Sequence, residues 1–122
     1  MEEFKITRVF SDESGESRFE ELQVPLTEAG PIGYLSERYE VESLIFRTVL
    51  STYDYDFHTA PARQFIILLD GAIEIETSLG DKKSFQAGDV LLVEDVAGQG
   101  HKTRNLEPAE RRSVFVTLKG PQ

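Results

Sequence analysis

The chain has only two histidines, His58 and His101, and a glutamine, Gln64, follows the first of them closely. An imidazole can ligate a metal ion, and beside a carboxylate it can transfer a proton near neutral pH. The Gln64 amide can donate and accept hydrogen bonds or offer a carbonyl oxygen to a cation. Each such group costs about 1–3 kcal/mol if it is buried without a partner. We therefore expect the three side chains to meet in one polar site.

A metal ion is the first chemistry to consider for this set. A divalent ion in a histidine-rich site usually takes neutral imidazoles together with an anionic carboxylate. His58, Gln64 and His101 form a neutral set, and an amide oxygen is a weaker donor than a carboxylate. We therefore expect no tightly held cofactor, with a divalent metal ion on these three residues as the alternative.

Acid–base chemistry without a metal needs a carboxylate that orients an imidazole. Asp56 shares a face with His58 if the chain is extended there, and Asp95 precedes His101 by a few residues. Asp95 has a competing interpretation, because Asp side chains often cap their own backbone at the start of a turn, here the turn toward Gly98. We favour the turn for Asp95.

Three arginines near these residues could clamp a carboxylate ligand. Successive side chains of a strand point to opposite faces, so Arg63 and Arg104 should face outward if the site residues on their strands face inward. Arg47 lies on a strand of unknown register, and Thr103 shares a face with His101. The candidate ligand-binding residues are therefore His58, Gln64, His101, Thr103 and Arg47.

The elements that must position these residues are short strands separated by turns. Apolar and polar residues alternate with period two, as at Ile73 and Ile75 with carboxylates between and after them, and strands closed by turns at nearly even spacing are typical of an all-β barrel or sandwich. Asp70-Gly71, between two apolar runs, predicts a β-hairpin. Residues 34–39 stay open between a helical turn and a loop. The expected strands are 4–10, 18–26 on a sheet edge, 41–52, the two runs that flank Asp70-Gly71, 90–93, 101–105 and 111–118.

The stretch 54–105 resembles the motifs of the cupin superfamily. The first cupin motif is a Gly, then His-x-His, a Glu three or four residues on, and a Gly seven after that. His58 matches the first histidine, Gln64 stands at the Glu position, and Gly71 lies seven residues beyond it. Ala60 replaces the second histidine, so the motif is degenerate in its metal ligands.

The second cupin motif is similar to the sequence from Gly88 onward, with His101 at the position of its final histidine and Asn105 near its closing Asn. The resemblance implies a single cupin-like domain over 1–122, a small β-barrel of the double-stranded β-helix or jelly-roll type. It also implies a site in the barrel interior, built from His58, Gln64 and His101.

The composition excludes several classes of function. The chain has 122 residues, no cysteine and a formal net charge of −9, so thiol catalysis is excluded and nucleic acid is not an expected partner. No apolar run is long enough to span a membrane, and the first residues lack a signal peptide's basic and apolar regions. We expect no membrane partner and a cytoplasmic location.

The assembly is predicted from strand edges. Strands 4–10 and 41–52 carry enough apolar residues to pair with a second copy if their edges are exposed. The resemblance implies the same, since many single-domain cupins are homodimers. We therefore expect a C2 homodimer.

Three functions stay open at this point. We favour a small cupin-like protein that binds a small molecule in the barrel interior without a tightly held metal. The alternative is a divalent-metal-dependent cupin enzyme, of dioxygenase or isomerase type, that uses His58, Gln64 and His101. A barrel that serves only as an interaction module is the third possibility.

Overall fold

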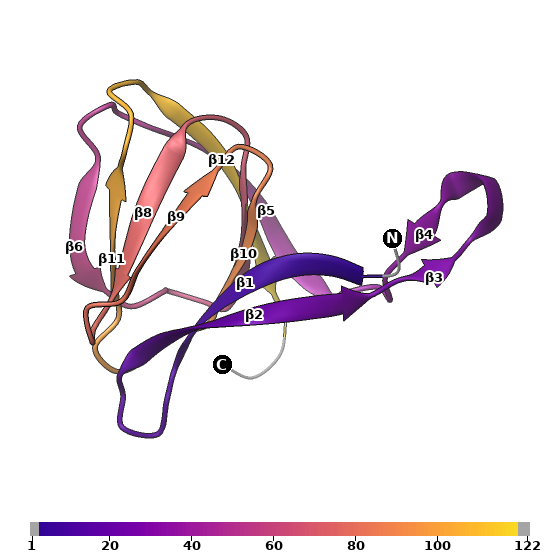
Figure 1. The fold of residues 1–122 in the computed structure, drawn as a ribbon, viewed down its shortest axis with the longest axis horizontal. Coiled ribbons are helices and arrows are strands. Elements are labelled where there is room, and N and C mark those ends of the chain that lie inside the picture. The colour runs from indigo at the N-terminus through magenta and orange to yellow at the C-terminus, as the bar shows by residue number, and fades with distance from the viewer. Residues whose placement is uncertain (1–2, 120–122) are drawn as a thin grey trace.

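The computed structural model describes residues 3–119, which fold into two facing β-sheets and a short hairpin arm (Figure 1). Within these residues the only helical segment is a 3₁₀ turn, η1 (Gly30–Ile32). The all-β fold class expected from the sequence is confirmed. The strands are β1 (Glu3–Ser11), β2 (Ser17–Pro25), β3 (Thr27–Glu28), β4 (Tyr34–Leu35), β5 (Val41–Val49), β6 (Asp54–His58), β7 (Gln64–Leu68), β8 (Ala72–Thr77), β9 (Lys82–Gln86), β10 (Val90–Val93), β11 (His101–Asn105) and β12 (Arg111–Leu118).

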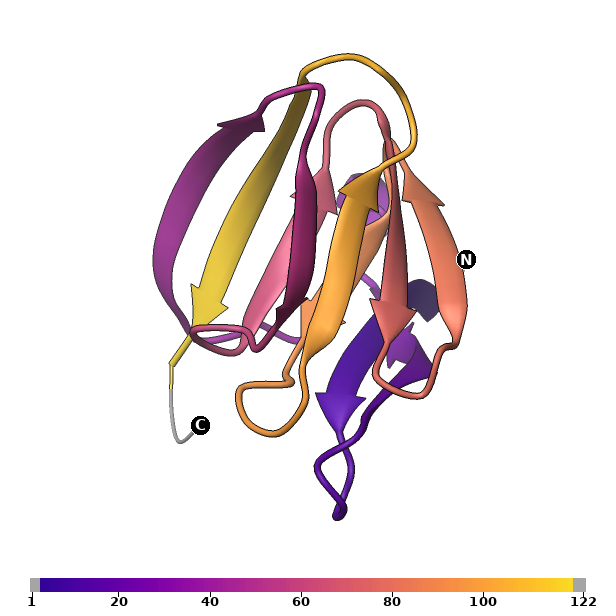
Figure 2. The same ribbon diagram turned by 90° about the vertical axis from the view of Figure 1, so that its left-hand side faces the viewer.

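Strands β5 to β12 form a jelly roll (Figure 2). Four of these strands lie in the six-stranded sheet, in the order β5-β12-β7-β10. The other four form the facing sheet, in the order β6-β11-β8-β9. The chain crosses from one sheet to the other at every connection in this part except the β8–β9 hairpin. This winding is the double-stranded arrangement of a jelly roll, so the cupin-like topology is confirmed by the strand order of the chain itself.

The β-hairpin predicted at Asp70-Gly71 is wrong. Strand β7 pairs with β10 and β12, whereas β8 pairs with β11 and β9, so the turn crosses between sheets. The Asp70 carboxylate accepts hydrogen bonds from the backbone N–H of Arg112 at 2.6 Å and from its Nε at 2.8 Å, which fastens the turn to β12. Packing β7 against β8 face to face buries both strands in one core, and this outweighs the local turn signal.

The edge predicted for 4–10 is also wrong, because β1 lies between β2 and β10 in the six-stranded sheet. Strand β2 forms the outer edge instead, as expected for a strand that ends in Pro25. At the opposite edge lies β5, which pairs only with β12 within the described residues. Of the two strands expected at an open edge, 4–10 and 41–52, only the strand that begins at Val41 lies at one.

The main core lies between the two sheets. The inward-facing side chains of β8 alternate strictly with outward-facing carboxylates, and Ile73 and Ile75 are buried as the sequence predicted. They pack against apolar residues of the six-stranded sheet, among them Leu68 and Leu91. This core occupies only part of the space between the sheets. The remainder is the cavity described below.

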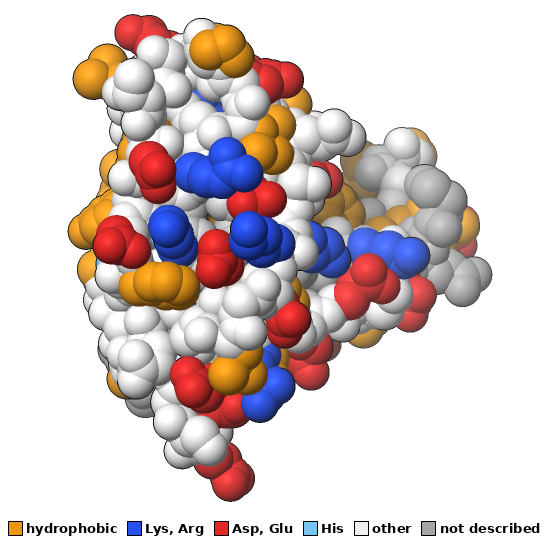
Figure 3. Space-filling model, turned by 60° about the vertical axis from the view of Figure 1, so that its left-hand side comes forward, with side chains coloured by type: hydrophobic (Ala, Val, Ile, Leu, Met, Phe, Trp, Pro, Cys, Tyr) orange, Lys and Arg blue, Asp and Glu red, His pale blue; other side chains and the backbone are white. Residues whose placement is uncertain are grey.

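Charged side chains of both signs lie on the outer face of the four-stranded sheet. Over the four-stranded sheet, Lys and Arg alternate with Asp and Glu (Figure 3), as in the ion pair between Arg104 and Glu74.

The β3–β4 hairpin projects from the sandwich as an arm, and residues 36–40 after it have no regular structure (Figure 1). The question left open for residues 34–39 is thus answered against a helix. No helix within residues 3–119 is long and apolar enough to cross a membrane.

Candidate functional site

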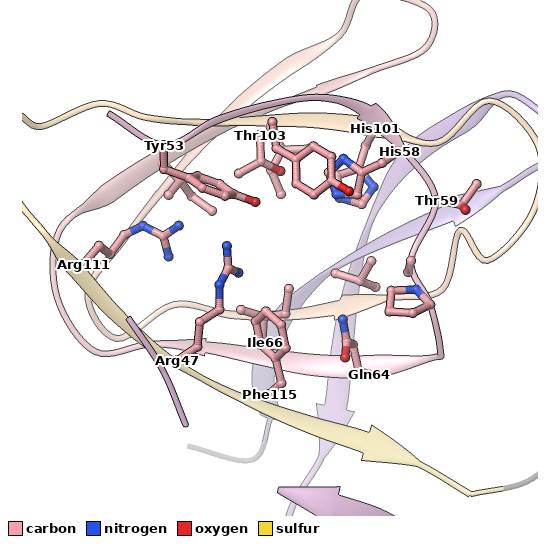
Figure 4. Close-up of a pocket in the computed structure, with 16 residues that line it drawn as sticks. Arg47, Tyr53, His58, Thr59, Gln64, Ile66, His101, Thr103, Arg111 and Phe115 are labelled. Carbon is pink, nitrogen blue, oxygen red and sulfur yellow. The ribbon is translucent and has the colours of Figure 1, made fainter. Parts of the chain in front are cut away.

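A cavity of about 430 Å³ lies between the two sheets of the jelly roll (Figure 4). Strands β5, β7, β8, β10, β11 and β12 and the chain from Tyr53 to Pro61 contribute its walls. Within the described residues no Asp or Glu side chain lines it. Its polar lining residues are Arg47, Tyr53, Tyr55, His58, Thr59, Gln64, His101, Thr103 and Arg111, and its other lining residues are Ala60, Pro61, Ile66, Ile73, Ile75, Val93 and Phe115.

The two histidines lie side by side at one end of this cavity, which we call the imidazole end. His58 on β6 is the cross-strand partner of His101 on β11, and their ring centroids are 4.6 Å apart at an interplanar angle of 54°. The Tyr55 ring stacks on the His58 ring at 3.9 Å. His58 Nδ1 is hydrogen bonded to the backbone oxygen of Asp56 at 2.8 Å, so the main chain, and not the Asp56 carboxylate, orients this imidazole.

His101 is oriented by a buried carboxylate. Asp95 Oδ2 lies 2.5 Å from His101 Nδ1, and the side chain of Asp95 is fully buried. The preference for Asp95 as a cap of its own turn is therefore wrong. The other oxygen, Oδ1, has no hydrogen-bond partner within residues 3–119. Because Nδ1 of each imidazole is engaged, Nε2 is the ring nitrogen that remains for a ligand in the cavity.

The imidazole end depends on a very close backbone approach at Gly100. Gly100 has φ +76°, and a Cβ built at this position would lie 2.1 Å from the carbonyl oxygen of His58. The Gly100 carbonyl accepts a hydrogen bond from Ser17 Oγ at 2.7 Å. Only glycine fits here, and it allows β11 to bring His101 directly opposite His58.

Gln64 and Thr103 also line the cavity, but in different places. Thr103 follows His101 on the same face of β11 and is buried. Gln64 begins β7 in the other sheet, so its amide faces the histidines across the cavity (Figure 4). His58, Gln64 and His101, which were expected to converge, thus share one cavity. The two histidines lie on one wall and Gln64 lies on the opposite wall.

Two arginines occupy the opposite end of the cavity, the guanidinium end, defined by Arg47, Arg111 and Tyr53 (Figure 4). The Arg47 guanidinium lies 4.8 Å from the centroid of the Tyr53 ring, and that of Arg111 lies 5.6 Å from it. Arg111 Nε donates to Asn105 Oδ1 at 2.9 Å. The sequence did not determine the register of the strand that carries Arg47. In the structure, the register of β5 against β12 turns Arg47 into the cavity.

Sequence reasoning missed Arg111, and for Asp95 it preferred the turn over the contact with the imidazole. The strand 111–118 was expected, but its centre is apolar on both faces, so the alternation gave no indication of where Arg111 points. The signal that could have found it is parity: Arg111 shares a face with Ser113 and Phe115 on β12.

The two arginines expected to face outward do so. Arg104 Nε donates to Glu74 at 3.0 Å on the outer face of the four-stranded sheet. Arg63 forms an ion pair with Glu94, which also accepts from Arg8. Neither Arg63 nor Arg104 lines the cavity.

The electrostatics of the cavity are positive. Burial lowers the pKa of His58, and its backbone hydrogen bond to Asp56 opposes this to a smaller extent. The charges of His101 and Arg47 lower the pKa further, and the charge of Asp95 raises it. Burial, followed by the neighbouring charge of Arg47, lowers the pKa of Arg111. Additional positive charge in this cavity is thus disfavoured.

A tightly held divalent metal ion does not fit this donor set. Within residues 3–119 no group of three or more His, Cys, Asp or Glu side chains is placed to hold one. Gln64 stands on the wall facing the two imidazoles, and its amide carries no negative charge. Two guanidiniums line the same cavity and repel a cation. A metal on His58, Gln64 and His101 would therefore lack the carboxylate that usually offsets its charge.

Comparison with known proteins gives only distant structural likenesses. No family model matches the chain, and no curated protein matches it. Protein NMB1881 from Neisseria meningitidis is similar over 67% of this chain and 83% of its own, with 18% identity and a TM-score of 0.47. The cupin domain of Cnp3 from Schizosaccharomyces pombe is similar over 98% of this chain and 86% of its own, with 12% identity and a TM-score of 0.46.

A third similar structure is ethanolamine utilization protein Q from Salmonella typhimurium, over 95% of this chain and 96% of its own, with 13% identity and a TM-score of 0.35. Two of the three structures thus align with almost the whole of this chain, but at low sequence identity. Likenesses this distant carry no argument about chemistry. The assignment of a cupin-like jelly roll to this chain depends on its own strand order.

Proposed function

We propose that this protein binds a small molecule in the cavity between its two sheets. The observation that carries the proposal is the cavity itself, about 430 Å³ in volume and lined by polar groups that converge from both sheets. Small-molecule sites in proteins commonly have volumes of about 300–1,000 Å³ and combine an apolar lining with a few placed polar groups. Here the apolar part comes from Ile66, Ile73, Ile75 and Phe115.

The imidazole end would supply directional hydrogen bonds to the bound molecule. His101 is held by Asp95, and His58 is held by the Asp56 carbonyl and by stacking on Tyr55. Such fixed rings can present Nε2 to a ligand with little loss of side-chain entropy on binding. The same pairing of imidazole and carboxylate is able to transfer a proton if the bound molecule offers one.

The competing function is a divalent-metal enzyme on His58, Gln64 and His101. The donor set disfavours it, because these ligands are neutral and Arg47 and Arg111 line the same cavity. Metal content separates the two functions. Elemental analysis of protein purified without chelators should find well below one divalent ion per chain. A stoichiometric ion, lost with activity in the His101→Ala variant, would instead support the enzyme.

Binding is tested by native mass spectrometry of the purified protein and by thermal-shift screening against a metabolite collection. We expect a retained mass or at least one compound that raises the melting temperature. His58→Ala should weaken the binding of that compound. Phe57→Ala is the matched control, because Phe57 is the preceding residue of β6, is 44% exposed and does not line the cavity. A screen with no retained mass and no stabilising compound would contradict the proposal.

We also propose a C2 homodimer that pairs through the open edge of β5. This edge strand carries exposed apolar side chains, with Phe46 78% and Leu44 57% exposed. Unpaired strand edges of this kind add a second strand readily. Light scattering should give twice 13.8 kDa, and Leu44→Lys should halve the mass, whereas Leu79→Lys at the β8–β9 turn should not. A 13.8 kDa species at micromolar concentration would overturn the dimer.

A further inference from the structure

The guanidinium end of the cavity holds two cations in a protein whose formal net charge is −9. Arg111 is only 2% exposed, and its partner among the described residues is the neutral amide of Asn105. Arg47 packs between the rings of Tyr53 and Phe115, at 4.8 Å and 4.9 Å from their centroids. Neither arginine forms an ion pair with a carboxylate of residues 3–119.

Strand pairing brings these two charges together. Arg111 stands opposite Val49 and Ser113 opposite Arg47, so Arg47 and Arg111 are diagonal neighbours on one face of the β12–β5 pair. Both guanidiniums point into the cavity (Figure 4). Two like charges in this position repel each other, and the pKa of Arg111 is lowered by its burial and by Arg47.

Buried charges in proteins are ordinarily paired, because removal of an ion from water is costly. Other arginines of this chain contact a carboxylate even though they are more exposed than Arg111, as Arg8, Arg63 and Arg112 do. The cavity arginines have stacking and one amide as partners, and these leave most of their N–H donors free. An anion between the two guanidiniums would complete the site, since each guanidinium matches an oxyanion in a forked geometry.

We propose that the ligand of this cavity is a small organic anion, whose carboxylate or phosphate group binds between Arg47 and Arg111. This inference rests on the proposed function and names the class of molecule. The remainder of the ligand would extend over the apolar side chains toward the imidazole end. There His58 and His101 offer hydrogen bonds to a second polar group.

The shape of the cavity supports an organic molecule over an inorganic ion. The two polar ends are separated by an apolar middle, formed by Ile66, Ile75 and Phe115. An inorganic phosphate would fill one end and leave this apolar surface in contact with water, whereas an organic acid would cover it. The ligand therefore needs a charged head, an apolar body and a polar tail.

The test compares charged ligands with neutral isosteres. Calorimetry would measure the affinity of succinate, benzoate and phenyl phosphate, together with succinamide and benzamide, and inorganic phosphate alone. We expect at least one organic anion to bind, its amide to bind at least tenfold more weakly, and affinity to fall as salt rises. The affinities of the two carboxylates, compared with that of phenyl phosphate, show which oxyanion the site prefers.

Arg47→Met and Arg111→Met keep the apolar stems and remove the charges, and each should weaken the best anion at least tenfold. Arg112→Met is the matched control: it is adjacent in sequence, its side chain is 66% exposed and it pairs with Asp70 on the outside. It should leave affinity unchanged.

Three outcomes would overturn the inference. If neutral compounds from the screen bind and anions gain nothing from Arg47 and Arg111, the small-molecule function stands and the anion inference fails. If no compound of either kind binds, both proposals fail. Equal loss of affinity in Arg111→Met and Arg112→Met would show a general charge effect and would also count against the inference.

Discussion

The two ends of the cavity hold their polar groups in opposite ways. At the imidazole end the protein supplies the partners itself, since His101 is bonded to the buried Asp95 and His58 to the main chain. At the guanidinium end Arg47 and Arg111 have aromatic rings and one amide as neighbours, and no carboxylate of residues 3–119 contacts them. The fold gives the Nδ1 atom of each imidazole a hydrogen-bond partner, whereas within residues 3–119 it gives the two guanidiniums no carboxylate.

This difference has a consequence for mutation. Removal of one partner of a buried hydrogen bond leaves the other without a partner in the interior, so the cost falls on stability. Removal of a charge that the fold leaves unpaired spares stability, and the cost falls on ligand binding. Five predictions test this contrast, the first four in order of the expected effect on the free energy of unfolding.

Gly100→Ala should have the largest effect, because a Cβ at this position would lie 2.1 Å from the His58 carbonyl oxygen. We expect a loss above about 4 kcal/mol in urea unfolding, or no folded protein. Gly80→Ala is the matched control: Gly80 also has a positive φ, +93°, but nothing lies within 4 Å of its Cβ position. The control should cost about 1–2 kcal/mol. Equal losses in the two variants would disprove the close-approach argument.

Asp95→Ala should lower the free energy of unfolding by about 1–3 kcal/mol, because it leaves His101 Nδ1 buried without a partner. Asp95→Asn keeps an oxygen that can accept from Nδ1–H and should cost less. Chemical denaturation of both variants measures the difference. If the Asn variant is no more stable than the Ala variant, the hydrogen bond is not what holds the imidazole end together.

Arg111→Met should leave the protein at least as stable as the wild type. Burial lowers the pKa of Arg111, so the folded state disfavours the charge relative to the unfolded chain, and the loss of that charge removes a penalty at neutral pH. Arg112→Met breaks an exposed pair, worth about 0–1 kcal/mol. Thermal unfolding followed by circular dichroism compares the two. A substantially lower melting temperature for Arg111→Met would mean that the guanidinium end is structurally complete.

The smallest effect is the pH dependence contributed by His58. Its pKa is lowered in the folded state by burial, so the unfolded chain takes up the proton first as the pH falls. The stability that depends on neutral His58 is fully present above its unfolded pKa of about 6.5 and is lost as the pH falls through the folded pKa. Urea titrations at pH 7.5 and 5.5 measure this loss, and His58→Gln should reduce it. An unchanged pH dependence in that variant would assign the loss to other groups.

Bound anion should act on the same titration in the opposite direction. Negative charge near Arg47 and His58 favours the protonated imidazole, so saturating succinate or benzoate, whichever binds, should raise the pKa of His58. The measurement is the chemical shift of the ring protons against pH, with and without the compound. The charge of Arg47 is one of the causes that lower the pKa of His58, so no change on saturation would count against binding of the anion beside Arg47.

The local pattern of the sequence was sufficient for most of the strands and for their parity, but the short strands Thr27–Glu28 and Tyr34–Leu35 and strand Lys82–Gln86 were not among those expected. Alternation along 73–76 predicted Ile73 and Ile75 inside with carboxylates outside, because successive side chains of any strand point to opposite faces. The same rule correctly placed Arg63 and Arg104 outside. The motif resemblance related His58 to His101 across 43 positions, although composition and periodicity contained no such information.

Tertiary structure decided which strands pair and therefore what the cavity contains. Asp70-Gly71 has the local signature of a hairpin, yet the chain crosses between sheets there, and residues of β7 and β8 pack in one core from opposite sheets. Parity is a relative quantity, so Arg47 and Arg111 could be turned inward only by their register against each other and against β7. His101 likewise faces His58 because Gly100 lets the backbones of the two segments approach closely. Sequence alone determined most of the strands and the alternation within each, whereas non-local pairing determined the site.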